Sequence, residues 1–369
     1  MTCSFKLDPA PGPGLIAAMT TPLLEHLRLQ GAGAAHLGSP FSAALMERAG
    51  ADVDAGGPAA AIFAPWAKES LRQLFAHAVA LRWLAALHDI VLAEPDGPLA
   101  ATYPRPDRPG DPEAAWPIAA ELTRARAAWM ADFMTHEPQT NEPRRAAVLL
   151  PGFLTVAAET RLPLRVLELG ASAGLNQLWD RRLYRLGDLP EWGPADAKVV
   201  IDAEWRGGAP PLAARVEVAG RAACDRSPVD LTDPAARRRL KAFVWADQFD
   251  RLARLDATIA EALAERVTVE RADAPAWTAR HGAPRPGVAS VIVHSVFFQY
   301  MPAESQAALV ATLGEFGAAA RPEAPLAWLR MEPAADSPAV MELRLTLWPG
   351  GHDRLLAHAH PHGAWVEWL

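Results

Sequence analysis

The sequence predicts an α/β protein with an N-terminal helical domain, residues 1–160, and a doubly wound, mainly parallel sheet domain, residues 161–369. Three observations support this fold class. The chain has 369 residues, a length that suggests two domains. Apolar residues recur at helical spacing before residue 160, and short β-rich runs alternate with helical segments after it.

The first part of the chain reads as helices without a convincing strand. Apolar residues at helical spacing run from Leu71 through Leu74, Leu81 and Leu84, which is the pattern of an amphipathic helix. Glycine and proline clusters interrupt such patterns and mark the loops between helices, at residues 56–58, 94–98 and 104–112.

Strand signals begin after Leu162 and Pro163. Their alternation with helical segments is typical of βαβ units and a parallel sheet. At the end of the chain, residues 341–348 alternate in strand fashion and Pro349-Gly-Gly351 forms a turn, which predicts an antiparallel C-terminal edge. The expected strands are residues 164–169, 221–224, 267–270, 288–294 and 326–331, then 341–348 and the extended pieces 355–360 and 364–368.

Composition limits the function classes. The formal net charge is −7, and scattered arginines make no basic patch, so we expect no nucleic acid partner and favour a small neutral or cationic ligand. Two cysteines, Cys3 and Cys224, cannot build a disulfide framework, which points to the cytoplasm. The apolar run at residues 15–19 is too short for a signal peptide, so we expect neither export nor a membrane anchor.

The most informative segment, residues 166–176, fits two incompatible chemistries. Read around Glu168, it is a strand and a glycine-bounded loop that approach a nucleotide cofactor. Read around Ser172, it is a G-x-S-x-G sequence, the nucleophile elbow of an α/β-hydrolase. A chain order of Ser172, an acid such as Asp273 and a late histidine keeps the hydrolase alternative open.

The flanks of this segment favour the cofactor. A hydrolase needs earlier strands and an upstream oxyanion loop, which residues 1–160 do not supply. A carboxylate at Glu168 also opposes the negative charge that a hydrolase must stabilise. A dinucleotide is disfavoured because Ser172 and Leu175 stand where G-x-G-x-x-G needs glycine.

An S-adenosylmethionine site needs no pyrophosphate cradle, and the successive strand ends suit it. Asp225 falls where an acid holds the ribose, Asp273 could accept the adenine amino group, and His294 ends the following strand. His294 is also read as a satisfied core imidazole, and Glu168 and Asp225 as helix-capping carboxylates. The candidate cofactor contacts are Glu168, Gly170, Ala171, Ser172, Gly174, Asn176, Asp225, Asp273 and Ala274.

Further candidates would act on a small-molecule acceptor. His294, Glu142 or Tyr300 could remove a proton from it, and Asn141 and Gln299 could bind it. Residues 139–142 lie in a predicted loop between the domains, where a helix cap is the alternative reading. His358, His360 and His362 alternate as metal ligands can, but Pro361 interrupts the segment and no fourth ligand is evident, so we predict structural histidines and no metal site.

Over residues 162–369 these strand ends resemble the class I S-adenosylmethionine-dependent methyltransferase fold, a Rossmann-like sheet. Nearly the whole chain resembles the bacterial family known as domain of unknown function 2332. That resemblance implies a methyltransferase-like fold. A further alternative is that a protein with this fold binds a nucleotide or a partner protein without catalysing a reaction. It rests on Gly38-Ser-Pro40, Ala55-Gly-Gly-Pro58, Gln139-Thr-Asn-Glu142 with Arg145, residues 168–176, Cys224-Asp225 with Pro228 and Asp230, His294-Ser295 with Gln299-Tyr300, Trp328-Leu-Arg-Met-Glu-Pro333, and His360-Pro-His-Gly363 with Trp365.

Overall fold

The computed structural model describes residues 13–337 and 339–369, and the side chains from residue 22 onward, so Cys3 lies outside the described residues. The chain forms two compact units. The helical unit is the described part of Met1–Thr140 together with Pro234–Leu252, and the sheet unit is Asn141–Asp233 together with Ala253–Leu369. This division differs from the predicted boundary at residue 160.

The helical unit contains no strand among its described residues, as the sequence predicts. Several of its helices begin with proline in the first turn, where the missing N–H costs no hydrogen bond. Its helices are α1 (Pro13–His36), α2 (Pro40–Asp54), α3 (Pro58–Phe63), η1 (Ala64–Trp66), α4 (Leu71–Ala76), α5 (Val79–Ala93), α6 (Pro112–Ala125), α7 (Ala127–Met134), α9 (Pro234–Ala242) and the first residues of α10 (Phe249–Ala264).

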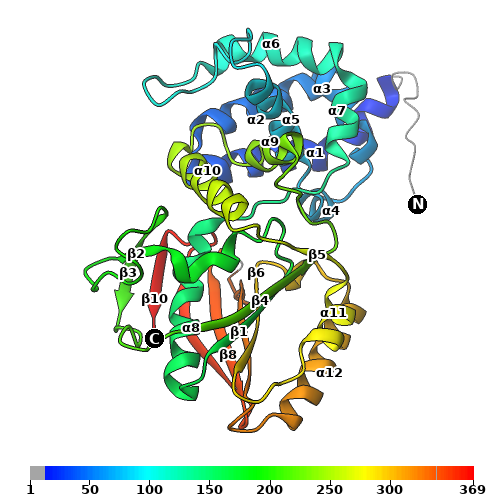
Figure 1. Cartoon of the computed structure of the whole chain (residues 1–369). Coiled ribbons are helices and arrows are strands. Elements are labelled where there is room, and N and C mark those ends of the chain that lie inside the picture. Colours follow the sequence, from blue (N-terminus) through cyan, green and yellow to red (C-terminus); the bar gives the residue numbers. More distant parts are fainter. Residues whose placement is uncertain (1–12, 338) are drawn as a thin grey trace. The chain divides into compact units, whose positions relative to one another are not determined.

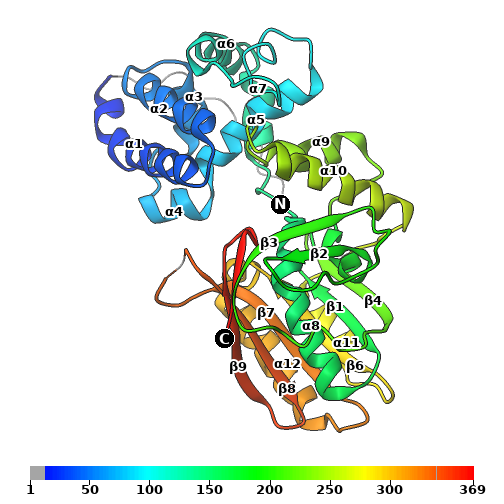
Figure 2. The same ribbon diagram turned by 90° about the vertical axis from the view of Figure 1, so that its left-hand side faces the viewer.

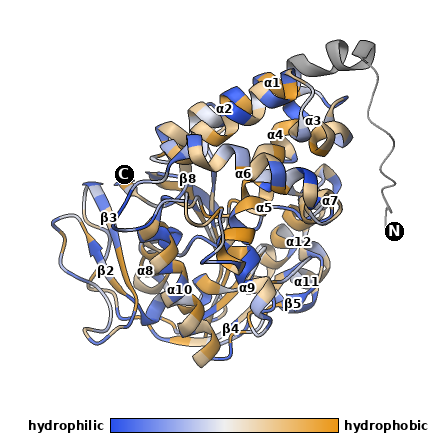
Figure 3. Cartoon of the chain, turned by 90° about the horizontal axis from the view of Figure 1, so that it is seen from above, coloured by the Kyte–Doolittle hydropathy of each residue, from blue (hydrophilic) through white to orange (hydrophobic). Residues whose placement is uncertain are grey.

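Helix α5 forms the centre of the helical unit. It is the strongly apolar helix among the others in Figure 3, and its Trp83 and Leu87 side chains are fully buried. The stretch Leu71–Ala93 is long and apolar enough to cross a membrane, but 67% of its most apolar window is buried inside the protein. Such burial is typical of a core helix in a soluble protein, and the cytoplasmic location stays a prediction.

Polar contacts explain why Pro234–Leu252 belongs to the helical unit. Arg238 pairs with the buried Asp89 at 3.1 Å, and the Nδ1 atom of His88 lies 2.9 Å from the Val244 carbonyl oxygen. The Asp247 carboxylate accepts hydrogen bonds from the Ser39 hydroxyl and the Phe41 N–H. These contacts join residues far apart in sequence.

The described part of the sheet unit contains one ten-stranded sheet with the order β2-β3-β10-β9-β8-β7-β6-β1-β4-β5. The strands are β1 (Leu164–Leu169), β2 (Leu183–Leu186), β3 (Val200–Gly207), β4 (Val218–Asp225), β5 (Glu270–Arg271), β6 (Ala289–Ser295), β7 (Leu326–Pro333), β8 (Met341–Trp348), β9 (His352–Ala359) and β10 (Trp365–Trp368).

Most pairings in this sheet are parallel, and the predicted antiparallel strands lie toward one edge. Strands β7, β8, β9 and β10 pair antiparallel in turn. Strands β2 and β3, which the sequence analysis did not predict, complete that edge in parallel with β10. The prediction of a strand over residues 267–270 was wrong in extent, because only Glu270 and Arg271 pair with β4.

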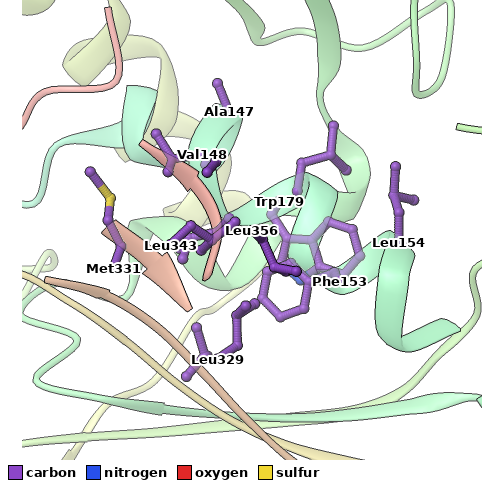
Figure 4. Close-up of a cluster of buried hydrophobic side chains, with 14 of the residues drawn as sticks. Ala147, Val148, Phe153, Leu154, Trp179, Leu329, Met331, Leu343 and Leu356 are labelled. Carbon is purple, nitrogen blue, oxygen red and sulfur yellow. The ribbon is translucent and has the colours of Figure 1, made fainter. Parts of the chain in front are cut away.

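Helices cover both faces of the sheet (Figures 1 and 2). Helix α8 (Ala146–Thr160) packs on one face, and α11 (Ala274–His281) and α12 (Ala303–Ala319) pack on the other. Under α8, the Phe153 ring stacks on Trp179 with centroids 4.1 Å apart, beside Leu329 and Leu343 (Figure 4). The buried strands are thereby packed against side chains of α8 on this face of the sheet.

Candidate functional site

The loop after β1 has a tightly constrained backbone. Gly170, Ser172 and Gly174 all have positive φ angles, of 63°, 53° and 72°. A Cβ atom on Gly170 would lie 2.1 Å from the Phe297 ring, and one on Gly174 would lie 2.8 Å from Val267. Glycine is therefore required at both ends of the loop, whereas Ser172 holds a left-handed conformation that costs a non-glycine residue about 1 kcal/mol or more.

Asp225 shapes this loop. Strand β4 pairs with β1, so Asp225 at its end lies beside the loop. Its two carboxylate oxygens accept hydrogen bonds from the Ser172 N–H and the Ser227 N–H, each at 2.8 Å. The structure thus brings together Ser172 and Asp225, two of the predicted cofactor contacts. The Asp225 carboxylate stabilises the conformation of the loop.

A second predicted segment contacts the residues that directly follow this loop. The Asn141 side-chain oxygen accepts a hydrogen bond of 2.8 Å from the Leu175 N–H, and the Asn176 side-chain amide donates one of 3.3 Å to the Glu142 carbonyl oxygen. The Glu142 carboxylate itself accepts the Arg144 N–H at 3.1 Å and caps the helix η2 (Pro143–Arg145). Asn141, Glu142 and Asn176 therefore form one buried cluster.

The histidine-rich turn near the C-terminus supports this cluster. The Arg145 side chain donates a 3.0 Å hydrogen bond to the Pro361 carbonyl oxygen. Gly363 has a φ angle of 71°, and a Cβ atom there would lie 2.4 Å from the Arg144 carbonyl oxygen. The turn of residues 360–363 thus packs directly against η2.

Of the three alternating histidines of this region, His360 and His362 lie together, with ring centroids 5.5 Å apart. The His360 Nδ1 atom accepts the His362 N–H at 3.0 Å, whereas His358 lies 3.9 Å from Glu367. In the part of the chain that the structure describes, no group of three or more histidine, cysteine or acidic side chains could hold a metal ion.

Glu168 is buried at the end of β1, immediately before the loop. Its Oε2 atom has no hydrogen-bond partner among the described residues, and neither has the Oδ1 atom of Asn176. Burial, together with the nearby Asp225 charge, raises the pKa of Glu168 to about 8, although the positive charge of Arg182 acts in the opposite direction. This carboxyl group is therefore largely protonated at neutral pH unless a cation comes to it.

Arg182 is a buried residue beside this candidate site that the sequence analysis missed. Its side chain is fully buried, with Nε 3.1 Å from Glu261 and Nη2 donating to the Leu175 carbonyl oxygen. The Nη1 atom has no partner among the described residues. No sequence signal marked it, because Arg182 precedes β2, a strand that was itself not predicted.

His294 is placed as a satisfied core imidazole. Its Nδ1 atom lies 2.7 Å from Glu332, and its Nε2 atom accepts the Trp328 indole N–H at 3.0 Å. Burial raises the pKa of Glu332, but hydrogen bonds from His294 and two backbone N–H groups outweigh this and lower it below its usual value. With both ring nitrogens engaged, His294 has no nitrogen available for proton abstraction, and this geometry favours its structural interpretation.

Most of the remaining candidates are exposed. Asp273 is exposed at the start of α11, and buried Ala274 follows it. Gln299 is exposed, as is Tyr300, with 68% of its surface accessible. None of Asp273, Gln299 and Tyr300 forms a hydrogen bond with the loop of residues 170–174 in the described structure, so their roles stay predictions.

The comparisons with known proteins bear on the whole chain. A family model described as "Uncharacterized protein conserved in bacteria (DUF2332)" matches residues 24–368. The chain belongs to this family. The match spans both units and all the candidate residues of this DUF2332 protein. No curated protein and no solved structure matches the chain.

Proposed function

We propose that this DUF2332 protein binds S-adenosylmethionine at the loop after β1 and transfers its methyl group to a small-molecule acceptor. The observation that carries the proposal is the Glu168 carboxyl group, buried and with its Oε2 atom unpartnered directly before a glycine-bounded loop. An unsatisfied buried carboxyl group destabilises a fold by about 1–3 kcal/mol or more. A bound cation, such as an ammonium group, would remove that cost.

The sheet order supports a cofactor at this place. The parallel strands run β5-β4-β1-β6-β7, which is the 3-2-1-4-5 order of a Rossmann-like, doubly wound sheet. Such sheets bind ligands at the carboxyl ends of the strands where the order reverses, here beside β1. Glu168 and Asp225 both stand at such ends.

The polar groups of the site suit the amino acid and ribose portions of S-adenosylmethionine. Glu168 and Asn176 each offer a buried, unpartnered oxygen to an ammonium group. Asp225 already accepts one backbone N–H at each oxygen, and a carboxylate oxygen has a second lone pair that a ribose hydroxyl could use. These residues therefore fit the cofactor.

When bound, S-adenosylmethionine supplies an activated methyl group. The chain's own contribution would be orientation and exclusion of water. Asp225 accepts the Ser172 N–H within the loop, and Asn141 accepts the Leu175 N–H directly after it. Both ring nitrogens of His294 are already engaged in hydrogen bonds. Among the candidate bases, Glu142 and Tyr300 therefore remain for the predicted removal of a proton from the acceptor.

The serine hydrolase alternative gains little from the geometry. The left-handed backbone at Ser172 suits a strained nucleophile turn. Its N–H, however, donates to the Asp225 carboxylate, and Glu168 lies in the same loop region. The Asp225 carboxylate beside the loop opposes the negative charge that builds up during acyl transfer.

Calorimetry with S-adenosylmethionine and S-adenosylhomocysteine tests the proposal. We expect both to bind the wild type and Glu168→Gln to weaken them about 10- to 100-fold, since a hydrogen bond to a charged group contributes roughly 1.5–3 kcal/mol. Glu265→Gln, which removes a surface carboxylate paired with Arg181, is the matched control and should bind normally.

The failure of both ligands to bind folded wild-type protein would overturn the proposal. Binding without methyl transfer to any small molecule of a cell extract would favour the non-catalytic alternative. Labelling by a fluorophosphonate probe that Ser172→Ala abolishes would favour the hydrolase.

A further inference from the structure

We infer that Arg182 binds the carboxylate of the ligand, so that the site selects an α-amino acid head group, with its paired ammonium and carboxylate, over a plain nucleoside or amine. This inference rests on the proposed function for the presence of a ligand at the loop after β1. It adds a specificity-determining residue that lies outside the glycine loop.

The hydrogen bonding of Arg182 is incomplete. None of its side chain is exposed, yet only Nε and Nη2 have partners, in the Glu261 carboxylate and the Leu175 carbonyl oxygen. The Nη1 atom is buried without a partner among the described residues. A charged donor left unsatisfied in the interior is costly, and native proteins rarely keep one without a ligand, a water molecule or an ion.

The charges around Arg182 match both ends of a zwitterion. Glu168 carries a buried, unpartnered acceptor, and Arg182 lies near enough that its positive charge lowers the pKa of Glu168 against the effect of burial. No ion pair joins these two residues within the described structure. The Asn176 side chain adds a third unpartnered atom, an acceptor, next to Leu175. Two acceptors and one cationic donor complement an ammonium group and a carboxylate.

A purely structural role for Arg182 makes a different prediction. In that case Arg182 only holds the Leu175 carbonyl oxygen and pairs with Glu261 of α10, and a water molecule joins Nη1 to Glu168. Loss of Arg182 would then loosen the loop and weaken every ligand to a similar extent. Recognition of a carboxylate would instead weaken only ligands that carry one.

The experiment compares three probes by calorimetry: S-adenosylmethionine, its decarboxylated analogue, which differs only in the carboxylate, and 5′-methylthioadenosine, which lacks the amino acid portion. We expect wild-type protein to bind S-adenosylmethionine about 10- to 100-fold more tightly than the decarboxylated analogue, the strength of one charge-assisted contact. Arg182→Met should abolish that preference and change the affinity for 5′-methylthioadenosine less than about threefold.

Two further variants separate recognition from folding. Glu261→Gln leaves Arg182 in place and removes the charge beside its Nε atom, so the preference for the carboxylate should survive. Arg182→Lys keeps a cation and should retain part of the preference even where Arg182→Met does not fold.

Distinct outcomes overturn the two proposals. If the wild type binds S-adenosylmethionine and its decarboxylated analogue equally, or if Arg182→Lys and Arg182→Met weaken all probes in parallel, the role of Arg182 is wrong while cofactor binding stands. If the wild type binds none of the probes, the proposed function fails, and the role of Arg182 fails with it.

Discussion

Glu168 works against the stability of the fold that carries it. Its carboxyl group is buried beside the Asp225 charge, and its pKa is raised to about 8. A neutral side chain of similar size at this position would not carry the cost of ionisation. A destabilising group at a strand end is a frequent property of ligand sites, where the ligand offsets the cost.

The pH dependence of unfolding follows from this side chain. The pKa of Glu168 in the folded protein, about 8, lies above the ordinary glutamate value of 4.5. The raised pKa therefore has no effect on stability below pH 4.5, and the free energy of unfolding falls by about 1.4 kcal/mol per pH unit as the pH rises from there toward 8. Glu168→Gln should remove this loss and make the ligand-free protein more stable at pH 8 than the wild type.

Urea unfolding at pH 5 and pH 8 measures the effect, with Glu265→Gln again as the control. A difference between Glu168→Gln and wild type that does not grow from pH 5 to pH 8 would contradict the raised pKa. The same variant is expected to bind ligand more weakly, so stability and binding should change in opposite directions.

Some candidate site residues could be predicted from their position in the sequence. The roles of others depend on contacts that only the structure shows. Glu168 and Asp225 were predicted because an acid at the end of an apolar strand is visible in the sequence. Both ring nitrogens of His294 are engaged by Trp328 and Glu332. These residues lie on the neighbouring strand, and the sequence pattern does not reveal that they contact His294. Arg182 likewise acquires its role only through Leu175 and Glu261.

At the scale of secondary structure elements, the segment before α8 is tied to the loop after β1 by Asn141. Asn141→Ala should leave the buried Leu175 N–H unsatisfied, which costs about 1–3 kcal/mol. Asn141→Asp keeps an oxygen acceptor and should be closer to wild type. Thermal unfolding and hydrogen exchange at Leu175 measure the change. Equal effects of the two substitutions would show that the hydrogen bond of 2.8 Å is not what stabilises the loop.

Strands β2, β3 and β5 show where sequence patterns fail for elements. The four residues of β2 are too short a run for a periodic signal. In β3, charged Asp202, Glu204 and Arg206 alternate with other residues, and the sequence analysis makes no prediction for this stretch. For β5 the apolar run at residues 267–269 was visible, but Val267 and Val269 pack against Gly174 and do not extend the ladder.

At the scale of the whole molecule, the two units should respond differently to acid. His26 and His88 are buried in the helical unit, and burial lowers the pKa of each to about 4. The unfolded chain binds these protons near pH 6.5, so the helical unit loses stability as the pH falls from 6.5 toward 4. The loss is of order 3 kcal/mol for each histidine at most.

Hydrogen exchange, corrected for its intrinsic pH dependence, should therefore show the helical unit losing protection first between pH 7 and pH 5. His26→Gln should reduce this loss, whereas His36→Gln, at an exposed position of the same unit, should not. Earlier loss in the sheet unit would contradict the prediction.

Composition and periodicity predicted the helical and sheet parts of the chain, but not that Pro234–Leu252 belongs with the helices. That assignment depends on pairs such as Asp89 with Arg238 and Ser39 with Asp247. Each pair joins residues more than a hundred positions apart, and no local pattern records such a match. The inserted segment reads as an ordinary helix of the sheet domain until its partners are known.

The sheet order also sets a sequence of events during synthesis. Strand β3 pairs with β2 on one side and with β10 on the other, and β10 leaves the ribosome long after β3. Until then β3 presents an open edge that another nascent chain could occupy. The charged Asp202, Glu204 and Arg206 along β3 are of the type that discourages pairing with another chain. The same charges that made β3 hard to predict from the sequence therefore protect its open edge until β10 is synthesised.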